Sequence, residues 1–161
     1  MVAAGLSRNG VGRLIFVTGT MTSFSYLQTL EFYKNDIQKL GQNLFLQQDN
    51  AAYHVGKKCL DYINKNFSNH LEFLPENSPD LSPIEELWAL VEEKLNCYNF
   101  KTLDEMTRKL LWVWNRIPKT ICKNLIDSFD KKLELLAEKK GERVNKRQHT
   151  RKNAYYTWRN S

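Results

Sequence analysis

The chain has 161 residues, of which 42% are hydrophobic and 12% aromatic, enough for one globular domain with a substantial core. Its sequence contains no apolar run of membrane-spanning length and no N-terminal signal-peptide pattern, so we expect no membrane partner. The net charge of +6 is uneven, because the segment from Lys139 onward has eight basic residues and one acid, whereas the remainder has a balance of −1.

All the predicted strands lie in the first half of the chain, together with two predicted helices. Apolar runs at residues 1–7 and 12–19 flank Asn9-Gly10, a dipeptide typical of a tight β-hairpin turn. Two further strands are predicted at 43–48 and 70–75. The periodicity predicts helices over 23–41 and 55–67. Their apolar positions are Phe24, Leu27, Leu30, Ile37 and Leu40 in the first helix, and Val55, Cys59, Tyr62 and Ile63 in the second.

Helices dominate the predicted second half. Ser82 and Pro83 are a good helix start, an N-cap followed by proline in the first turn. A capping box, Thr102 with Glu105, starts the next helix, and the last helix ends at Gly141. Strands followed by helices indicate an α/β fold in which helices pack over one mixed sheet. The apolar stripe of the helix after Ser82 consists of Ile84, Leu87, Trp88, Val91 and Leu95.

Basic residues and aromatic rings are mixed in residues 142–161, after a predicted domain over 1–141. Such a tail is often disordered and solvated, and this interpretation stays open beside nucleic-acid binding and a nuclear address. Rings that stack on bases beside cations that meet phosphates favour nucleic acid. The rings are Tyr155, Tyr156 and Trp158, and the candidate nucleic-acid contacts are Lys146, Arg147, Arg151, Lys152 and Arg159.

The three cysteines are Cys59, Cys97 and Cys122, which are far apart and include no Cys-x-x-Cys pair. This spacing argues against a disulfide framework and against a structural zinc site. We therefore predict buried free thiols and a reducing compartment.

Carboxylates follow two of the predicted apolar runs. Asp49 and Asn50 come directly after residues 43–48, and Glu85 and Glu86 stand in the first turn of a later helix. The carboxyl end of a core strand lies at the rim of an α/β sheet, where ligands bind. Two carboxylates that converge there would hold Mg²⁺ or Mn²⁺, which prefer oxygen ligands. Simpler roles stay open, since these residues can also end a strand, cap a helix or complement a helix dipole.

Two motifs, QQDNAAYH and SPDLSPIEELW, together resemble the catalytic domain of Tc/mariner-superfamily transposases, the DDE type with a ribonuclease H-like fold. The predicted hairpin, the helix after it and the final helix are also similar to the family, so the resemblance covers about residues 2–141. It implies three acidic residues that hold two divalent metal ions, one on the attacking and one on the leaving oxygen of a displacement at phosphorus. The family uses this site to cut DNA and to join a 3′-hydroxyl to a new target.

The resemblance assigns a role to each motif residue. Asp49 matches the second acid and Glu85 the third. We expect their carboxyl groups to lie about 4–7 Å apart and to hold Mg²⁺ or Mn²⁺ between them. Glu86 fits less well, because the motif puts the acid directly after Pro-Ile. Asn50 and His54 match motif positions for which we expect a supporting role, orienting the Asp49 loop. DNA is the implied partner, and the nucleus is the implied location.

The first acid of the triad has no match, because no acidic residue precedes Glu31. The central first strand of the family's sheet and its N-terminal DNA-binding region have no match either. We therefore expect an N-terminally truncated catalytic domain, inactive alone, whose sheet is closed by rearrangement, by homo-oligomerisation or by another chain. Two other interpretations stay open: an active transposase whose preceding part lies on an unrecorded exon, and a domesticated non-catalytic module that binds DNA or a protein.

Overall fold

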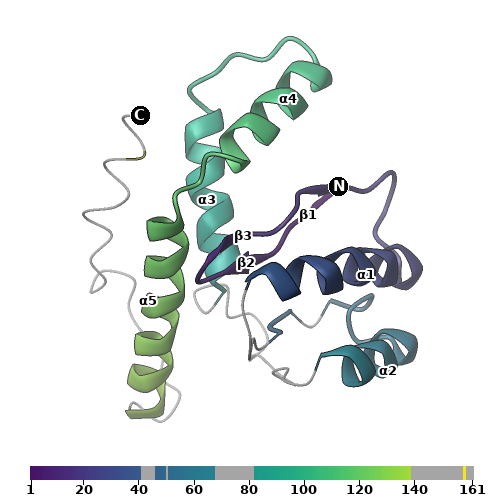
Figure 1. The fold of residues 1–161 in the computed structure, drawn as a ribbon. Coiled ribbons are helices and arrows are strands. Elements are labelled where there is room, and N and C mark those ends of the chain that lie inside the picture. Colours follow the sequence, from purple (N-terminus) through teal and green to yellow (C-terminus); the bar gives the residue numbers. More distant parts are fainter. Residues whose placement is uncertain (41–45, 50, 68–81, 139–157, 159–161) are drawn as a thin grey trace. The chain divides into compact units, whose positions relative to one another are not determined.

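The computed structural model describes residues 1–40, 46–49, 51–67, 82–138 and 158 (Figure 1). The chain divides into two compact units. Unit 1 comprises Met1–Gly5 and Gly12–Ser78, and unit 2 comprises Leu6–Val11 and Pro79–Ser161. None of the helices in these described ranges is long and apolar enough to cross a membrane.

The N-terminus forms an antiparallel hairpin whose strands are interrupted by a bulge. Val2–Ala3 (β1) pairs with Ile15–Phe16 (β4), and Leu6–Ser7 (β2) pairs with Gly10–Val11 (β3). Between the Ala3–Ile15 pair and the hydrogen bond from Gly12 N to Gly5 O (2.8 Å), one strand has two residues and the other has one. Two residues opposite one define a β-bulge, which bends the strand and divides the predicted long strands into short ones.

The predicted hairpin turn is confirmed, with a shift of one residue. Ser7 pairs with Gly10, so the two central residues of the turn are Arg8 and Asn9. Gly10 has a φ of 144°, in a region that L side chains rarely adopt, which explains why glycine stands there. The Ser7 hydroxyl donates to the Gly10 carbonyl (3.2 Å) and accepts from the Asn9 N–H (3.2 Å), so the turn is closed by its own side chain.

Unit 1 continues with Ser23–Leu40 (α1) and Lys57–Asn66 (α2), which lie side by side (Figure 1). Both predicted helices are confirmed, with ends within a few residues of those expected. Their apolar sides meet in one core, because residues three and four positions apart share a helix face. Its buried members are Met21, Tyr26, Leu30, Cys59, Ile63 and Phe67.

Two predicted core positions of unit 1 are wrong. Phe24 is 71% exposed. Tyr26 and Leu30, one turn apart, define the inward face of α1. Phe24 lies about 200° away from Tyr26 around the helix, so it faces away from the core. Val55 is 41% exposed, because it precedes the first residue of α2 and has no helical register. The side chains of Ile37 and Leu40 lie outside the described part of the chain.

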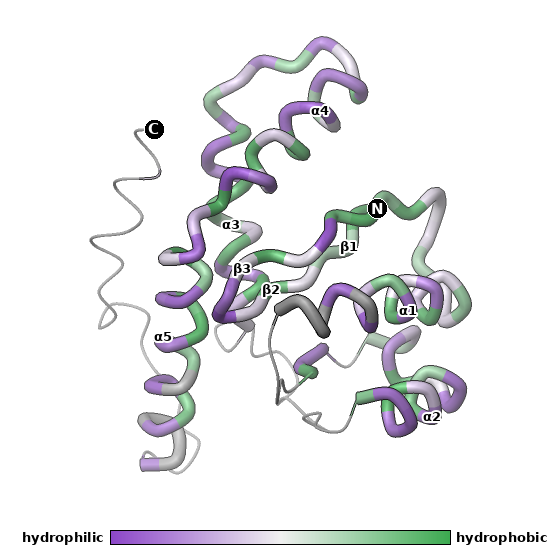
Figure 2. Tube along the Cα trace, viewed as in Figure 1, coloured by the Kyte–Doolittle hydropathy of each residue, from purple (hydrophilic) through white to green (hydrophobic). Residues whose placement is uncertain are grey.

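Unit 2 contains Pro83–Leu95 (α3), Leu103–Trp114 (α4) and Lys119–Glu138 (α5), and α3 packs against both other helices (Figure 1). Hydrophobic and hydrophilic residues alternate along these helices, as expected for elements with one buried face (Figure 2). The rings of Trp88 and Trp114 stack with centroids 4.9 Å apart, which ties α3 to α4. The most deeply buried side chains of this core are Leu87, Val91, Val113, Trp114, Ile121 and Cys122.

The turn of the hairpin binds α5 through charged side chains. Arg8 forms an ion pair with Asp127 (2.9 Å), and Lys123 bonds the other carboxylate oxygen (2.8 Å). These two cations, Lys123 first, hold the pKa of Asp127 below its usual value. The short strands β2 and β3 therefore belong to the helical unit.

The two predicted helix starts in unit 2 differ in how they are capped. Ser82 is the N-cap residue of α3 and Pro83 follows it, as predicted, but the Ser82 side chain makes no capping hydrogen bond. At α4 the predicted capping box is present: Glu105 N–H donates to Thr102 Oγ1 (3.1 Å), and Glu105 Oε2 accepts from the backbone N–H of Lys101 (2.9 Å). The carboxylate thus closes the turn one residue before the cap.

The predicted single mixed sheet is not seen in the described residues, which form two two-stranded sheets and five helices. Leu46 makes a single bridge, and the rest of the strand predicted at 43–48 lies partly outside the described part of the chain. The strand predicted at 70–75 lies wholly outside it, as does the end of the last helix at Gly141. The predicted division at residue 141 stays a prediction.

Candidate metal centre

Asp49 lies at the end of the short described segment that follows the Leu46 bridge in unit 1. The Tyr26 hydroxyl on α1 donates to Oε1 of Gln48, which fixes the residue directly before Asp49. The Asp49 side chain is 64% exposed, and its Oδ1 accepts the backbone N–H of Ala51 (3.1 Å). Within the described ranges, the contacts from Ala51 and from His54 both involve Oδ1.

His54 is folded back onto Asp49 by a turn. The backbone N–H of His54 donates to the Ala51 carbonyl (2.8 Å), which closes that turn. Nδ1 of His54 then lies 2.6 Å from Asp49 Oδ1 and 3.1 Å from the Asp49 carbonyl oxygen. Both neighbours can only accept, since an ionised carboxylate and a carbonyl have no hydrogen to give. Nδ1 therefore carries the proton, and a neutral His54 has its lone pair on Nε2.

Two tyrosine rings hold the His54 imidazole in place. The ring centroid of Tyr26 lies 4.2 Å from that of His54, and the centroid of Tyr53 lies 4.4 Å from it. His54 is only 14% exposed as a result. Burial, and to a lesser degree the nearby Cys59 and Asp49, raise the pKa of Tyr26 well above its usual value. Burial and then Asp49 also raise the pKa of Tyr53. Both phenols stay protonated, and Tyr26 stays a donor to Gln48.

The two glutamates of α3 lie in its first turn, where a carboxylate also complements the helix dipole. Glu86 is half-buried and binds Lys132 of α5, whose side chain is 13% exposed. Its negative charge is therefore compensated inside unit 2. Glu85 is exposed, and its backbone N–H donates to the Ser82 carbonyl (3.1 Å). The two neighbours thus have different surroundings, because Glu86 contacts α5 and Glu85 is exposed.

The structure brings together some of the predicted site residues. His54 contacts Asp49 directly, whereas Glu85 belongs to the other unit, so the predicted spacing of Asp49 and Glu85 stays a prediction. Asn50 lies outside the described residues. Among the described residues no group of three or more His, Cys, Asp or Glu side chains forms a metal cage.

Three residues that support the Asp49 loop, Tyr26, Gln48 and Tyr53, are not among the predicted site residues. Tyr53 stands beside His54 inside the motif, so its ring was available as a signal. Tyr26 is one helical turn before Leu30, and that spacing could have placed it in the core. Only the fold shows that its hydroxyl reaches Gln48.

One prediction for the tail is wrong. Trp158 was expected to stack on nucleic-acid bases, but it is only 4% exposed and lies in unit 2 against α3. Nζ of Lys94 lies 4.6 Å from the centroid of its ring and donates to the Trp158 carbonyl (2.7 Å). The five predicted nucleic-acid contacts of the tail lie outside the described residues.

Both candidate ligands fit a hard divalent cation. Asp49 offers an exposed carboxylate whose Oδ1 is held by two N–H donors, and Glu85 offers an exposed carboxylate on a rigid helix. Carboxylate oxygens are the donors that Mg²⁺ and Mn²⁺ prefer. Fixing one oxygen by hydrogen bonds orients the other and lowers the ordering cost of binding an ion.

Comparison of the sequence with protein families gives a match to the family described as DDE superfamily endonuclease, over residues 1–107. The Tcb1 transposase of Caenorhabditis briggsae is 29% identical over 143 residues, 88% of this chain and 52% of its own length. The Tc3 transposase of Caenorhabditis elegans is 30% identical over 134 residues, 81% of this chain and 40% of its own length. The chain thus spans about half the length, or less, of these curated relatives.

A solved structure has the same fold. The crystal structure of the catalytic domain of Mos1 mariner transposase superposes with a TM-score of 0.74, covering 86% of this chain and 72% of that chain at 18% identity. The superposition therefore confirms that the chain shares the fold of this catalytic domain, as expected, although the described strands are short. The same Mos1 domain has been solved with Raltegravir and Mg, and with Raltegravir and Mn.

We predict that Asp49 and His54 are energetically coupled. In a double-mutant cycle of Asp49→Ala and His54→Ala, the coupling free energy of unfolding should be about 1 kcal/mol, because the imidazole is mostly buried and its N–H meets a charged acceptor. Urea unfolding of the four proteins provides the measurement.

The control cycle uses Asp104→Ala and Arg108→Ala. This pair also spans one ion contact (3.0 Å), but its side chains are 72% and 69% exposed, so we expect coupling of only about 0.3 kcal/mol. Coupling of Asp49 with His54 that is no larger than this control contradicts the described arrangement.

Proposed function

We infer that this chain, which belongs to the Tc1/mariner transposase family of DDE superfamily endonucleases, supplies two carboxylates to a divalent-metal site for DNA cleavage and strand transfer. Asp49 is the second acid of that site and Glu85 the third. The observation that carries the proposal is the Asp49 carboxylate, which is exposed and oriented by His54 and Ala51.

The residues around Asp49 hold its carboxylate in one orientation. The N–H donors of His54 and Ala51 both bond the same oxygen, Oδ1. The rings of Tyr26 and Tyr53 prevent the imidazole from rotating away. His54 thus acts as a positioning residue, because its Nδ1–H is used by Asp49 and not by a substrate.

On α3, the pairing of Glu86 with Lys132 supports Glu85 as the metal ligand. A cation that bound Glu86 would have to displace Lys132 from a mostly buried contact, which leaves the lysine charge uncompensated. Glu85 is exposed in the first turn of α3, where a cation can approach from solvent. When bound there, Mg²⁺ or Mn²⁺ would stabilise negative charge on the phosphate and on the attacking and leaving oxygens.

The first acid of the proposed site has no match within these 161 residues, since no acid precedes Glu31. Two carboxylates compensate two divalent ions poorly, because the ions repel each other at close distance. We therefore propose that the 161-residue chain binds one ion weakly and does not cut DNA alone.

DNA is the proposed partner, and the nucleus the proposed location. A solved structure described as the Mos1 transposase paired-end complex with left transposon end superposes with a TM-score of 0.78, covering 89% of this chain and 44% of that chain at 16% identity. The basic residues of 142–161 provide charge for phosphates, while the rest of the chain is close to neutral. We also propose that a second copy of this chain, or another chain, pairs with it to complete the sheet.

We predict weak Mn²⁺ binding without nuclease activity. Purified chain should leave nicked and intact duplex DNA uncut in Mn²⁺, and water-proton relaxation should report one weakly bound ion. Asp49→Ala and Glu85→Gln should each abolish most of that binding, because each removes a charged oxygen donor.

Glu92→Gln is the matched control, since Glu92 is another exposed carboxylate on α3 and should be dispensable. Equal loss in Glu92→Gln would refute Glu85 as a ligand. Nuclease activity that disappears in Asp49→Ala would show that the chain can cut DNA without the missing first acid.

We predict that the tail dominates binding to duplex DNA. Replacing Lys146, Arg147, Arg151, Lys152 and Arg159 with glutamine should weaken binding and flatten its salt dependence by about 0.9 logarithmic unit for each phosphate contact removed. This variant keeps Trp158 and its contact with Lys94. Fluorescence anisotropy across a salt series provides the measurement.

The control changes the net charge equally at five exposed lysines of the helices: Lys57, Lys58, Lys65, Lys119 and Lys131. It should retain most of the affinity. Equal effects of the two variants would mean that net charge alone, and not the tail, governs binding.

A further inference from the structure

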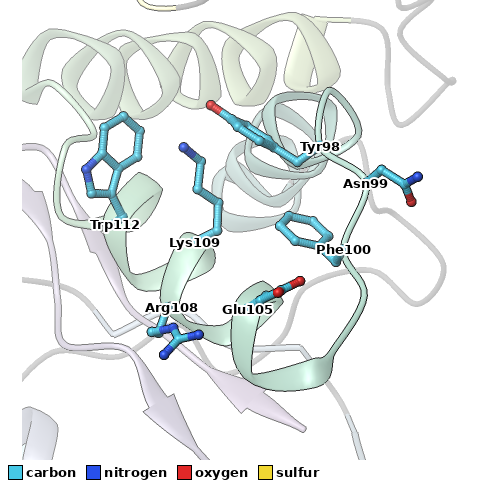
Figure 3. Close-up of a pocket in the computed structure, with 7 residues that line it drawn as sticks. All are labelled: Tyr98, Asn99, Phe100, Glu105, Arg108, Lys109 and Trp112. Carbon is cyan, nitrogen blue, oxygen red and sulfur yellow. The ribbon is translucent and has the colours of Figure 1, made fainter.

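An open pocket of about 450 Å³ lies on α4 and the loop that precedes it, within unit 2 (Figure 3). Its size falls within the ~300–1,000 Å³ range typical of ligand sites. The pocket is built from aromatic rings and charged side chains, and none of the catalytic candidates contributes to it. Its lining consists of Tyr98, Asn99, Phe100, Glu105, Arg108, Lys109 and Trp112.

Trp112 lies on the outer face of α4. Val113 and Trp114 point into the core and are 0% and 1% exposed, whereas Trp112 is 39% exposed. A tryptophan on the solvent face of a helix leaves a large apolar ring partly in water, which core packing does not require. Tyr98, 43% exposed, adds a second ring from the loop, and Phe100 stacks on it with centroids 6.0 Å apart.

A lysine ammonium lies between the two exposed rings. Nζ of Lys109 is 3.8 Å from the ring centroid of Tyr98 and 4.0 Å from the ring centroid of Trp112. Figure 3 shows the Lys109 side chain between these two rings. The guanidinium carbon of Arg116 lies 4.2 Å from the Trp112 centroid. The rings therefore have two cations against them, in cation–π geometry.

The positive charge of this surface is only partly compensated. Residues 98–116 contain four basic side chains and two acidic ones. Asp104 pairs with Arg108, and Glu105 closes the turn at Lys101. Within the described residues no carboxylate lies at ion-pair distance from Lys109 or Arg116. An anionic ligand would meet both.

We propose that this pocket binds a single-stranded nucleic-acid segment. One unpaired base stacks on Trp112 and Tyr98, and the adjoining phosphates bind Lys109 and Arg116. Rings that accept bases beside cations that accept phosphates are the two components of single-strand binding sites. A cationic ligand fits less well, because Lys109 already occupies the place between the rings. Duplex DNA fits less well, because its bases are stacked on one another.

Lys109 can make room for the base. Its four-carbon side chain is flexible, so the ammonium can leave the space between the rings and turn toward a phosphate. The binding needs no divalent ion and neither Asp49 nor Glu85. The inference therefore goes beyond the proposed catalytic role and can fail or hold independently of it.

The test compares a labelled thymidine oligonucleotide with a duplex of equal length, using the full chain in EDTA and fluorescence anisotropy. Trp112→Leu should weaken single-strand binding about tenfold and duplex binding less than about twofold, because leucine keeps apolar volume but cannot stack. Trp112→Phe should retain most of the single-strand affinity. Lys109→Gln should weaken it and flatten its salt dependence by about 0.7 logarithmic unit.

Phe24→Ala and Lys131→Gln are the matched controls, since both change exposed residues on helices outside the pocket. Both should leave the preference for single strands unchanged. Thermal unfolding of each variant separates lost binding from lost folding, and Trp112→Phe keeps the test open if Trp112→Leu is unstable. Equal losses on duplex and single strand, equal losses in the controls, or equally tight binding of polyglutamate would overturn the proposal.

Discussion

Nδ1 of His54 faces two acceptors at once, the carboxylate and the carbonyl oxygen of Asp49. This arrangement fixes the tautomer of the imidazole, the rotamer of the acid and the turn that joins them. It depends in turn on α1, because Tyr26 packs on the imidazole and bonds the residue before Asp49. The core between α1 and α2 therefore positions an exposed carboxylate through a chain of three contacts. A supporting shell of this kind is what a metal ligand on a loop requires.

The first turn of α3 separates two adjacent glutamates by their surroundings. Glu86 is directed to Lys132 and stabilises the packing of α3 on α5, whereas Glu85 is exposed one residue earlier. A mostly buried ion pair is costly to break, because it leaves one charge without a partner. The same pair therefore restrains the rotation of α3 and supports the proposal that Glu85, not Glu86, binds a cation. In this proposal, structural and functional roles are divided between neighbouring residues of one motif.

The sequence predicts the helices and the hairpin well, and their tertiary contacts poorly. Periodicity and capping signals locate all five helices of the described residues. The hairpin turn is off by one residue because Gly10 pairs with Ser7 instead of turning the chain. Phe24 is misplaced because apolar spacing alone does not define which face of α1 is buried. The His54 contact with Asp49 follows from a turn whose geometry no pattern encodes. The burial of Trp158 is a contact between residues 64 positions apart, which composition cannot indicate.

A crystal structure of the 161-residue chain soaked in Mn²⁺ tests the central claim most directly. Anomalous scattering locates the ion without assumptions about its ligands. Our account predicts a peak bonded at about 2.0–2.6 Å by one oxygen of Asp49 and one of Glu85. His54 Nδ1 should still bond the Asp49 carboxylate in that structure. An ion bound at other carboxylates, or Asp49 and Glu85 carboxyl groups more than about 14 Å apart, would contradict the account.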